Sequence, residues 1–362
     1  MTKYLITGIA GFIGSNLAKT LVQRGDSVRG IDNFATGKGE NIAAIAQHID
    51  FREADLLNPA AMADACAGVD VVFHEAAIPS VPKSVKDPYT SNRANVDGTL
   101  NLLIAARDAG AKRVVYAASS SAYGDTPTLP KHEAMPPRPI SPYAVSKLTG
   151  EFYMQVFSRC YGLETVSLRY FNVFGPHQDP NSPYSGVLAK FSLAMLAGQS
   201  PTIYGDGEQS RDFTYIDNVV AANLLAAHAP AAQVSGRVIN VACGQAVTLN
   251  QAVRLLQELT GYQGPTVYGP ERAGDIKDSL AEISSARELL GYDPRVDFRT
   301  GLARTVEWYR ETLATIGRTK QARTESATGS ALHRADAPAL HARMENVRYS
   351  SARKDTHCLN IR

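Results

Sequence analysis

A tyrosine and a lysine four residues apart are the first candidates for acid–base chemistry. Tyr143 and Lys147 stand in the segment SPYAVSK, and a helix would place both side chains on one face. A tyrosine phenol has an ordinary pKa of about 10, so it needs a nearby cation to act as a base near neutral pH. The Lys147 ammonium would supply that cation. Because a Tyr-x-x-x-Lys pair also arises by chance on helix surfaces, the motif needs independent support.

Three consecutive serines about 24 residues upstream give part of that support. Ser119, Ser120 and Ser121 follow the apolar segment KRVVYAA, which we expect to be a buried strand. Serine runs are usually solvated loop residues. Together with a glycine turn, a serine cluster at this distance makes the Tyr-x-x-x-Lys motif a stronger candidate.

A glycine-rich turn near the N-terminus predicts a dinucleotide site. Gly8, Gly11 and Gly14 are spaced as GxxGxxG in TGIAGFIG, after a predicted strand and before a predicted helix. Such a turn lets the backbone approach a pyrophosphate, whose charge the helix N-terminus stabilises. The next predicted strand ends at Asp32, whose carboxylate can bond the adenosine ribose and repel a 2′-phosphate. We therefore expect NAD rather than NADP, although the nearby cation Lys38 argues the other way.

The ends of the neighbouring strands extend this cofactor site. Asn33 closes the second predicted strand, and Asp55 with Leu56 closes the third, where an adenine edge can be held. Ala76 and Ala77 close the fourth, and their small side chains would let a phosphoribose lie on the strand ends.

The order of the predicted elements indicates an α/β fold with a doubly wound parallel sheet. Apolar strand-like runs alternate with helical patterns through the first half of the chain. We expect residues 1–172 to form a Rossmann-like NAD-binding domain. Residues 173–316 would form a smaller mixed α/β substrate lobe that returns segments to the first domain, and 317–362 a basic, disordered tail.

Composition and charge exclude several classes of function. The 362 residues carry a formal net charge of +2, but residues 317–362 hold nine basic against four acidic residues. The rest of the chain is therefore slightly acidic and lacks a nucleic-acid footprint. The four cysteines lie far apart, without metal-ligand spacing, so we expect reduced thiols and no metal. The first apolar run is too short for a membrane span or signal peptide, which favours a cytoplasmic protein.

Taken together, the motifs resemble the extended short-chain dehydrogenases/reductases, and within them the nucleotide-sugar epimerases. The resemblance covers roughly residues 3–312 and is nearest to bacterial UDP-N-acetylglucosamine 4-epimerases. It rests on the segments TGIAGFIG, HEAA, SVPKS, SSSAYGD, YAVSK, RYFNVFGP, SRDFTYIDN and RAGD.

The resemblance implies a tightly held NAD that is reduced and reoxidised within one turnover. Tyr143 would take the proton of the sugar 4-hydroxyl, and Lys147 would bond the nicotinamide ribose. Ser119 would hydrogen-bond the 4-oxygen and share the proton path. The further cofactor contacts that the resemblance implies are Phe12, Ile13, Asn95, Tyr170 and Val173.

A UDP-sugar site in the second lobe is also implied. Arg211 and Arg272 would make bidentate contacts with the diphosphate, and Asn172 would reach one of its oxygens. Asp275 would bond the uridine ribose, and Tyr204 would stack on uracil. The remaining substrate contacts implied are Ser80, Ser119, Ser120, Tyr143, Gln178, Val187 and Ser279.

The serine triplet separates the possible reactions of this family. Related dehydratases carry Asp and Glu where this chain has Ser120 and Ser121, and related decarboxylases keep the Glu. Neither serine can do that acid–base work. The glucuronate 4-epimerases remain a competitor, although they would place an arginine after FGP, where this chain has His177, Gln178 and Asp179. Asp179 would repel a sugar carboxylate.

A small residue at the sugar pocket favours acetylated substrates. Ser279 stands where larger side chains exclude an acetamido group in this family, and Ser80, Ser120 and Gln178 could bond that group. The expected reaction is interconversion of UDP-GlcNAc and UDP-GalNAc, with UDP-Glc and UDP-Gal as weaker substrates. Because Lys83 and Arg93 lie close by in sequence, a uronate or N-acetylglucosaminuronate substrate stays open.

Two other classes of function are also open. A sugar-nucleotide reductase would exchange its NAD(P)H with solution, and a non-catalytic nucleotide-binding regulator would lack Tyr143 or Lys147, both of which are present. The family habit implies a homodimer through the apolar helices expected at 91–109 and 143–161.

Overall fold

The computed structural model describes residues 2–179, 186–271 and 277–332, the last of these as backbone only beyond Thr315. Residues Met1–Glu311 form one compact unit, and Thr312–Arg362 form a second.

A seven-stranded parallel sheet forms the centre of the molecule. Its strand order is β11-β6-β5-β4-β1-β2-β3, and every neighbouring pair is parallel. This confirms the predicted α/β fold class. The strands are β1 (Lys3–Thr7), β2 (Ser27–Asp32), β3 (Ile49–Glu53), β4 (Val71–His74), β5 (Arg113–Ser119), β6 (Glu164–Tyr170) and β11 (Arg237–Val241).

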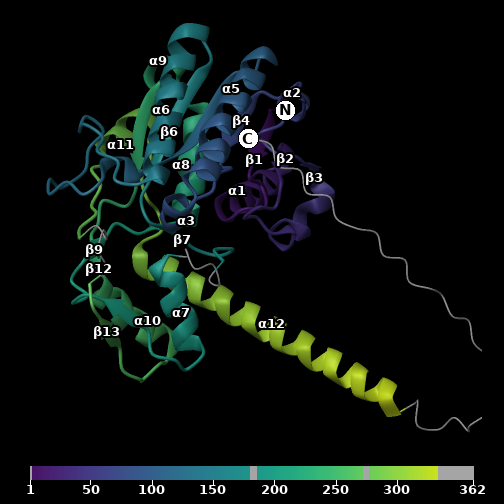
Figure 1. Cartoon of the computed structure of the whole chain (residues 1–362), viewed down its shortest axis with the longest axis vertical. Coiled ribbons are helices and arrows are strands. Elements are labelled where there is room, and N and C mark those ends of the chain that lie inside the picture. The colour runs from purple at the N-terminus through teal and green to yellow at the C-terminus, as the bar shows by residue number, and fades with distance from the viewer. Residues whose placement is uncertain (1, 180–185, 272–276, 333–362) are drawn as a thin grey trace, which may run out of the picture. The chain divides into compact units, whose positions relative to one another are not determined.

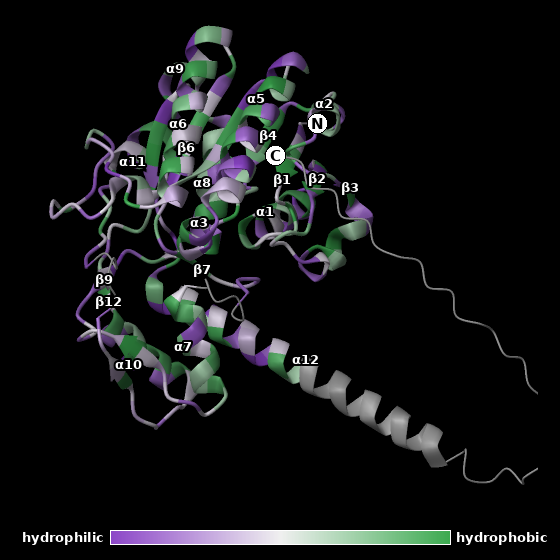
Figure 2. Cartoon of the chain, viewed as in Figure 1, coloured by the Kyte–Doolittle hydropathy of each residue, from purple (hydrophilic) through white to green (hydrophobic). Residues whose placement is uncertain are grey.

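Helices cover both faces of this sheet, so its strands are buried on two sides (Figure 1). Along β1, Tyr4 and Ile6 enter one hydrophobic core while Leu5 enters the other, as the two-residue repeat of a strand requires. This double burial explains the continuous apolar runs of the strands (Figure 2). The covering helices are α1 (Phe12–Gln23) and α8 (Ile216–His228) on one face, and α2 (Pro59–Cys66), α5 (Gly98–Asp108) and α6 (Pro142–Tyr161) on the other.

Helix α6 begins where its sequence predicts. The Ser141 hydroxyl accepts a hydrogen bond from the Ala144 N–H at 3.2 Å, and Pro142 occupies the first helical turn. The helix ends at Gly162, whose φ of +70° suits a residue without a side chain. These signals fix Tyr143 in the first turn of the helix, next to the end of the sheet.

A smaller group of elements follows the sheet along the chain. In Figure 1, α7, α10 and β13 gather at the bottom of the view. The elements are α7 (Val187–Leu196) and α10 (Leu249–Thr260), with the strand pairs β8 (Thr202–Tyr204) and β13 (Val267–Gly269), β9 (Ser210–Arg211) and β12 (Val247–Thr248), and β7 (Val173–Phe174) and β10 (Thr214–Tyr215). Between them the chain returns to the sheet through α8 and β11.

The remaining elements are short connections, except for the last helix. The short ones are α3 (Val81–Lys86), α4 (Pro88–Asn92), a π-helical turn (Arg93–Asp97), α9 (Ala231–Val234), α11 (Ser284–Leu290) and the 3-10 helices η1 (Gly39–Asn41), η2 (Ala43–His48) and η4 (Ser120–Tyr123). Helix α12 (Phe298–Leu332) passes Gly317, where we expected the disordered tail to begin; residues 333–362 lie outside the described residues. Within the described ranges, no helix is both long and apolar enough to cross a membrane.

Candidate active site

The end of β5 and the first turn of α6 bring Ser119 and Tyr143 together. Ser119 is the last residue of β5, and its side chain lies close enough to the phenol of Tyr143 to affect the pKa of that phenol. Burial raises the pKa of Tyr143 above its ordinary value of 10, and the Ser119 side chain opposes that rise. The phenol therefore needs positive charge nearby before it can serve as a base near neutral pH.

Lys147 lies one helical turn further on, deep in the protein. Its side chain is 3% exposed, its Nζ donates to the carbonyl oxygen of Ala117 at 2.8 Å, and it stands 4.9 Å from the centre of the Tyr116 ring. Burial lowers the pKa of Lys147 to about 8, against the opposing effect of the Glu75 and Glu151 carboxylates. The ammonium is thus still charged at neutral pH.

The serine triplet forms a tight turn at the end of β5. Ser119 caps the 3-10 helix η4, and its Oγ accepts from the N–H of Ser121 at 3.2 Å. The Ser121 hydroxyl donates to the same Ser119 oxygen at 2.9 Å. Ser120 is half-buried between them.

Two serines outside the predicted set hold the start of α6 in place. The Ser84 hydroxyl on α3 accepts from the N–H of Tyr143 at 3.0 Å. The Ser146 hydroxyl donates to the Tyr143 carbonyl at 2.8 Å and accepts from the Asn95 side chain at 3.0 Å. Asn95 also accepts from the N–H of Ile78, so it ties the chain after β4 to the catalytic helix.

The glycine turn is built for close backbone approach. Gly8 has a φ of +69°, and a Cβ there would lie 2.8 Å from the backbone of Ala76. A Cβ on Gly14 would lie 2.3 Å from the Gly8 carbonyl oxygen. Helix α1 begins after Gly11 with no side chain capping it, so its first N–H groups, including those of Phe12 and Ile13, suit a pyrophosphate. These features fit a dinucleotide.

Carboxylates at the ends of β2 and β3 form the other part of this site. Asp32 is 8% exposed and is held by the N–H groups of Ala10 at 2.9 Å and Phe34 at 2.8 Å, and burial raises its pKa. Each oxygen keeps a lone pair for a ribose hydroxyl. The Asn33 side chain donates to Asp55 at 2.9 Å, which joins the two strand ends.

Three further residues of the predicted cofactor set are placed at these strand ends. Leu56 packs against Gly98, where a Cβ would lie 2.8 Å from the Leu56 Cβ. Ala77 follows β4 and is half-buried, as is Val173 at the start of β7.

Lys38 is committed to an ion pair. Its ammonium lies 3.0 Å from the carboxylate of Asp179, which follows the segment FGPHQ. The pair joins the loop after β2 to the loop after β7. Because Lys38 is paired, its charge is a weaker argument for the 2′-phosphate of NADP. Because Asp179 is paired, its charge is a weaker argument against a carboxylate on the sugar.

The histidine at the end of β4 has a structural environment. His74 is fully buried, with Nδ1 2.8 Å from the Thr7 hydroxyl and Nε2 2.8 Å from the Thr99 hydroxyl. Burial lowers the pKa of His74 to about 3, with the positive charge of Lys147 adding to the effect. A neutral ring with both nitrogens engaged by hydroxyl groups suits a structural role at the strand end.

Sequence reasoning missed Glu75, which follows His74. The Tyr170 hydroxyl donates to Glu75 Oε1 at 2.9 Å and accepts from the Asn223 amide at 2.8 Å. Glu75 Oε2 is buried and has no hydrogen-bond partner among the described residues. Burial raises the pKa of Glu75 to about 7, although Tyr170 and Lys147 oppose the rise. An acid directly after the apolar run VVFH was the available signal.

The structure brings some of the predicted substrate residues together. The backbone carbonyl of Ser210 accepts from Arg211 Nη1 at 2.8 Å and from the Ser279 N–H at 3.1 Å, so Arg211 and Ser279 share one corner. The Asn172 side chain donates to the Asp212 carbonyl at 3.3 Å. Tyr204 is half-buried on β8, with its ring beside Gly269.

The other predicted substrate residues have separate surroundings. Ser80 is buried and caps α3, accepting from the Lys83 N–H at 3.1 Å, and Val187 begins α7. Gln178 Nε2 donates to the Val173 carbonyl at 3.2 Å, whereas its Oε1 is buried without a partner among the described residues. Arg272 and Asp275 lie outside the described residues.

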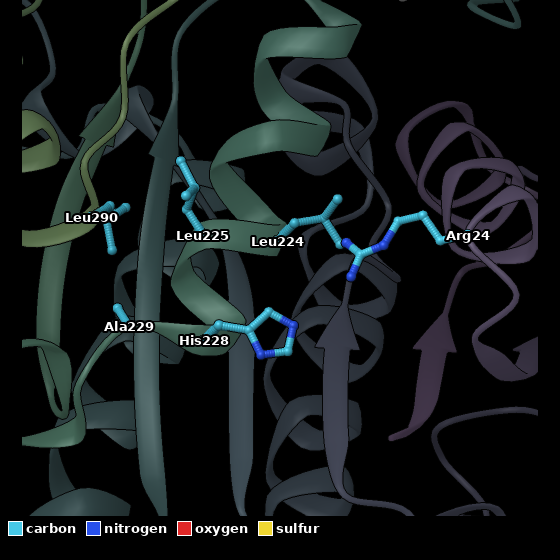
Figure 3. A pocket seen from close by; sticks show the side chains of 6 residues that line it. All are labelled: Arg24, Leu224, Leu225, His228, Ala229 and Leu290. Carbon is cyan, nitrogen blue, oxygen red and sulfur yellow. The ribbon is translucent and has the colours of Figure 1, made fainter. Parts of the chain in front are cut away.

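A surface hollow at the other end of the sheet is separate from this site. It is lined by Arg24, Leu224, Leu225, His228, Ala229 and Leu290 (Figure 3). His228 Nε2 lies 3.0 Å from the hydroxyl of Tyr4, near the start of β1, whereas the candidate catalytic residues follow the carboxyl ends of the strands.

Comparison with known proteins agrees with the predicted fold. The model of the NAD dependent epimerase/dehydratase family matches residues 4–242. The chain is 38% identical over 311 residues to the UDP-glucose 4-epimerase of Mycolicibacterium smegmatis, which covers 84% of this chain and 98% of that protein.

Two solved structures are also similar. One is a UDP-N-acetylglucosamine 4-epimerase from Methanobrevibacter ruminantium in complex with UDP-N-acetylmuramic acid, at 40% identity and a TM-score of 0.82, covering 86% of this chain and 99% of that one. The other is a mutant UDP-glucuronic acid 4-epimerase from Bacillus cereus with NAD and a fluorinated UDP-glucuronic acid, at 32% identity and a TM-score of 0.80, covering 86% and 100%.

The fold and the site define an NAD-dependent enzyme of the extended short-chain dehydrogenase/reductase class. The chain belongs to the NAD dependent epimerase/dehydratase family, and the proteins it resembles here are isomerases that act on UDP-sugars.

Proposed function

We propose that this protein is a UDP-sugar 4-epimerase that interconverts UDP-GlcNAc and UDP-GalNAc. Bound NAD would accept a hydride from C4 of the sugar and return it to the opposite face. Tyr143 would hold the proton of the 4-hydroxyl between the two steps, and Lys147 would favour the phenolate through its charge. Ser119 would bond the Tyr143 oxygen. The lowering effect of the Ser119 side chain on the pKa of Tyr143 supports this assignment.

The observation that carries the acetylated substrate is the Gln178 amide oxygen, which has no partner among the described residues. The amide nitrogen donates to the Val173 carbonyl, so Oε1 is the atom that could accept from a ligand. A buried acceptor without a donor costs about 1–3 kcal/mol, and the N–H of an acetamido group would relieve that cost. The small, half-buried Ser279 leaves room for the group.

A uronic substrate is the second candidate. The ion pair between Lys38 and Asp179 compensates the charge that would repel a carboxylate. Similarity to the glucuronic acid epimerase of Bacillus cereus agrees with this reading. The two candidate substrates differ in the acetamido group at C2 and the carboxylate at C6 of the sugar.

The experiment is incubation of the purified protein with UDP-GlcNAc, UDP-Glc or UDP-glucuronate, without added cofactor, followed by chromatography of the product sugars. We expect UDP-GalNAc to form fastest. Tyr143→Phe should lose turnover at least 100-fold while still binding UDP-sugar. Absence of a 4-epimer from all three substrates refutes the function, and preferential turnover of UDP-glucuronate selects the second candidate.

Gln178 variants separate the substrates more directly. Gln178→Leu should lower kcat/KM for UDP-GlcNAc about tenfold more than for UDP-Glc, because only the acetylated sugar loses a partner. The ratio of the two substrates within this one variant is the internal control, because the loss of the bond to the Val173 carbonyl affects both substrates. An equal loss on both substrates would contradict the role given to the amide oxygen.

We also propose a homodimer through α5 and α6. Val145, Phe152 and Val156 are about half exposed on one face of α6, and Ile104 is 38% exposed on α5. Their spacing along α6 gives one continuous apolar stripe, which a second copy of the same helices would cover.

A further inference from the structure

A short loop after β7 carries Gln178, the residue to which we assign the acetamido group. The loop runs from Gly175 to Asp179, and its contacts reach three parts of the chain that are distant in sequence. These parts are α1, the connection after β2, and α12. No sequence motif pointed to α12, so its contacts with the loop need an explanation.

Helix α1 and the connection after β2 hold the residues on either side of Gln178. The Asn16 side chain donates to the Pro176 carbonyl at 3.0 Å. The Lys38 ammonium lies 3.0 Å from the Asp179 carboxylate. Neither contact involves Gln178 itself, so other groups must determine where this residue lies.

Tyr309 on α12 holds the backbone of Gln178. Its hydroxyl donates to the Gln178 carbonyl at 2.9 Å, and the tyrosine is 1% exposed. A buried hydroxyl needs such a partner, because burial removes its hydrogen bonds to water. The bond therefore satisfies the phenol and fixes the position of Gln178 relative to α12.

The neighbouring residue on α12 holds the residue before Gln178. The rings of Trp308 and His177 are stacked, with centroids 5.5 Å apart and planes at 22°. His177 Nε2 also lies 2.6 Å from the Lys19 ammonium on α1. His177 has a φ of +71°, a conformation that residues with a side chain rarely adopt and that persists only where the surroundings hold it. Contacts with both helices therefore stabilise this turn of the loop.

The side chain of Gln178 has a separate anchor. Its Nε2 donates to the Val173 carbonyl at 3.2 Å. A Cβ on Gly186, just before α7, would lie 3.3 Å from the same nitrogen, so the glycine leaves room for the amide. The direction of the buried Oε1 is thus determined at two points, by Val173 at the amide and by Tyr309 at the backbone.

We propose that Tyr309 is a positioning residue for substrate selection, which holds Gln178 so that its amide oxygen meets the N–H of the acetamido group at C2 of the sugar. The proposal rests on the proposed function. Tyr309 acts through Gln178 rather than on the sugar, and Trp308 supports the same placement through His177. Helix α12 thereby takes part in the choice of substrate.

Loss of the Tyr309 hydroxyl should change the binding of acetylated substrates only. The acetamido group does not react, so its bond to Gln178 is equally strong in the ground state and in the transition state. A weaker bond therefore raises KM and leaves kcat unchanged. UDP-Glc lacks the acetamido group, so its KM should stay the same.

The test is a double-mutant cycle of Tyr309→Phe and Gln178→Leu in the full-length holoenzyme, with kcat and KM measured for UDP-GlcNAc and UDP-Glc. In the wild-type background, Tyr309→Phe should raise KM for UDP-GlcNAc about threefold, a part of the roughly tenfold loss expected when the amide is removed. In the Gln178→Leu background it should leave the ratio of the two substrates unchanged, because the group that it positions is gone.

Tyr292→Phe is the matched control. Tyr292 is also 1% exposed, and its hydroxyl donates to a backbone carbonyl, that of Ala242, at 3.0 Å. This variant loses a comparable hydrogen bond and should leave the substrate ratio unchanged. An unchanged ratio in Tyr309→Phe, or the same fall in both backgrounds or in Tyr292→Phe, overturns the proposal. A wild type that makes no UDP-GalNAc from UDP-GlcNAc refutes the proposed function instead, so the two failures are distinguishable.

Discussion

Replacing Glu75 by glutamine should make the protein more stable at alkaline pH and leave it unchanged in acid. The Glu75 residue is half-buried, but its Oε2 atom is buried and lacks a hydrogen-bond partner in the described structure. Ionising that carboxyl inside the protein costs more than ionising it in the unfolded chain. Glutamine has nearly the same shape, keeps an acceptor for Tyr170 and carries no charge.

The size of the effect follows from the pKa of the carboxyl. Burial raises the pKa of Glu75 from 4.5 to about 7. At about 1.36 kcal/mol for each pH unit, the ionised group lowers the free energy of unfolding by about 3 kcal/mol. No penalty exists below pH 4.5, where both states are protonated; it grows as pH rises to 7 and is constant above. A bound cationic nicotinamide would favour the ionised carboxylate of Glu75. The destabilisation of about 3 kcal/mol is therefore an upper bound for the enzyme with NAD bound.

The assay is urea unfolding of the wild type and Glu75→Gln at pH 5 and pH 8. The stability gain of the variant should be small at pH 5 and approach about 3 kcal/mol at pH 8. Glu288→Gln, on the exposed side of α11, is the matched control and should show no such trend. A variant that is less stable at both values of pH, or a gain independent of pH, would refute the account of Glu75.

Three further predictions concern catalysis, specificity and assembly. Addition of UDP-GlcNAc should raise the absorbance at 340 nm about 100-fold more slowly in Lys147→Met than in the wild type, because the phenolate loses its cation. The wild-type rate should decline above about pH 8, where the Lys147 ammonium loses its proton. An unchanged rate in the methionine variant would contradict its role. Ser279→Tyr should lose UDP-GlcNAc turnover before UDP-Glc turnover, and the reverse order would show that the pocket argument is wrong. Phe152→Asp with Val156→Asp should convert a dimer to a monomer in sedimentation, and a wild type that is already monomeric would refute the dimer.

Local patterns were sufficient to predict the sheet and the catalytic helix. The alternation of apolar runs and helical segments led to the parallel sheet, and the segment SPYAVSK led to the helix that carries Tyr143 and Lys147. These features depend on residues that are neighbours in sequence. The glycine turn could be predicted for the same reason, because Gly8 adopts a backbone conformation that other residues avoid.

Contacts between distant segments could not be read in this way. Lys38 and Asp179 are 141 positions apart, so the sequence shows two charges and the structure shows one ion pair. The same holds for Glu75, whose protonation depends on Tyr170 and Lys147 from other elements. Ser121 illustrates a third limit, because its residue type alone does not predict that its hydroxyl donates to Ser119.

The position of β11 has a consequence for how the chain is made. Residues Arg237–Val241 supply the strand that covers the outer edge of β6, although more than 60 residues of other structure intervene. During synthesis, the edge of β6 therefore stays unpaired until β11 has left the ribosome. An unpaired strand edge is prone to pair with a wrong strand. For the same reason, a fragment that ends at residue 172 would expose the edge of β6; a shortened chain would need to reach at least Val241 to cover it.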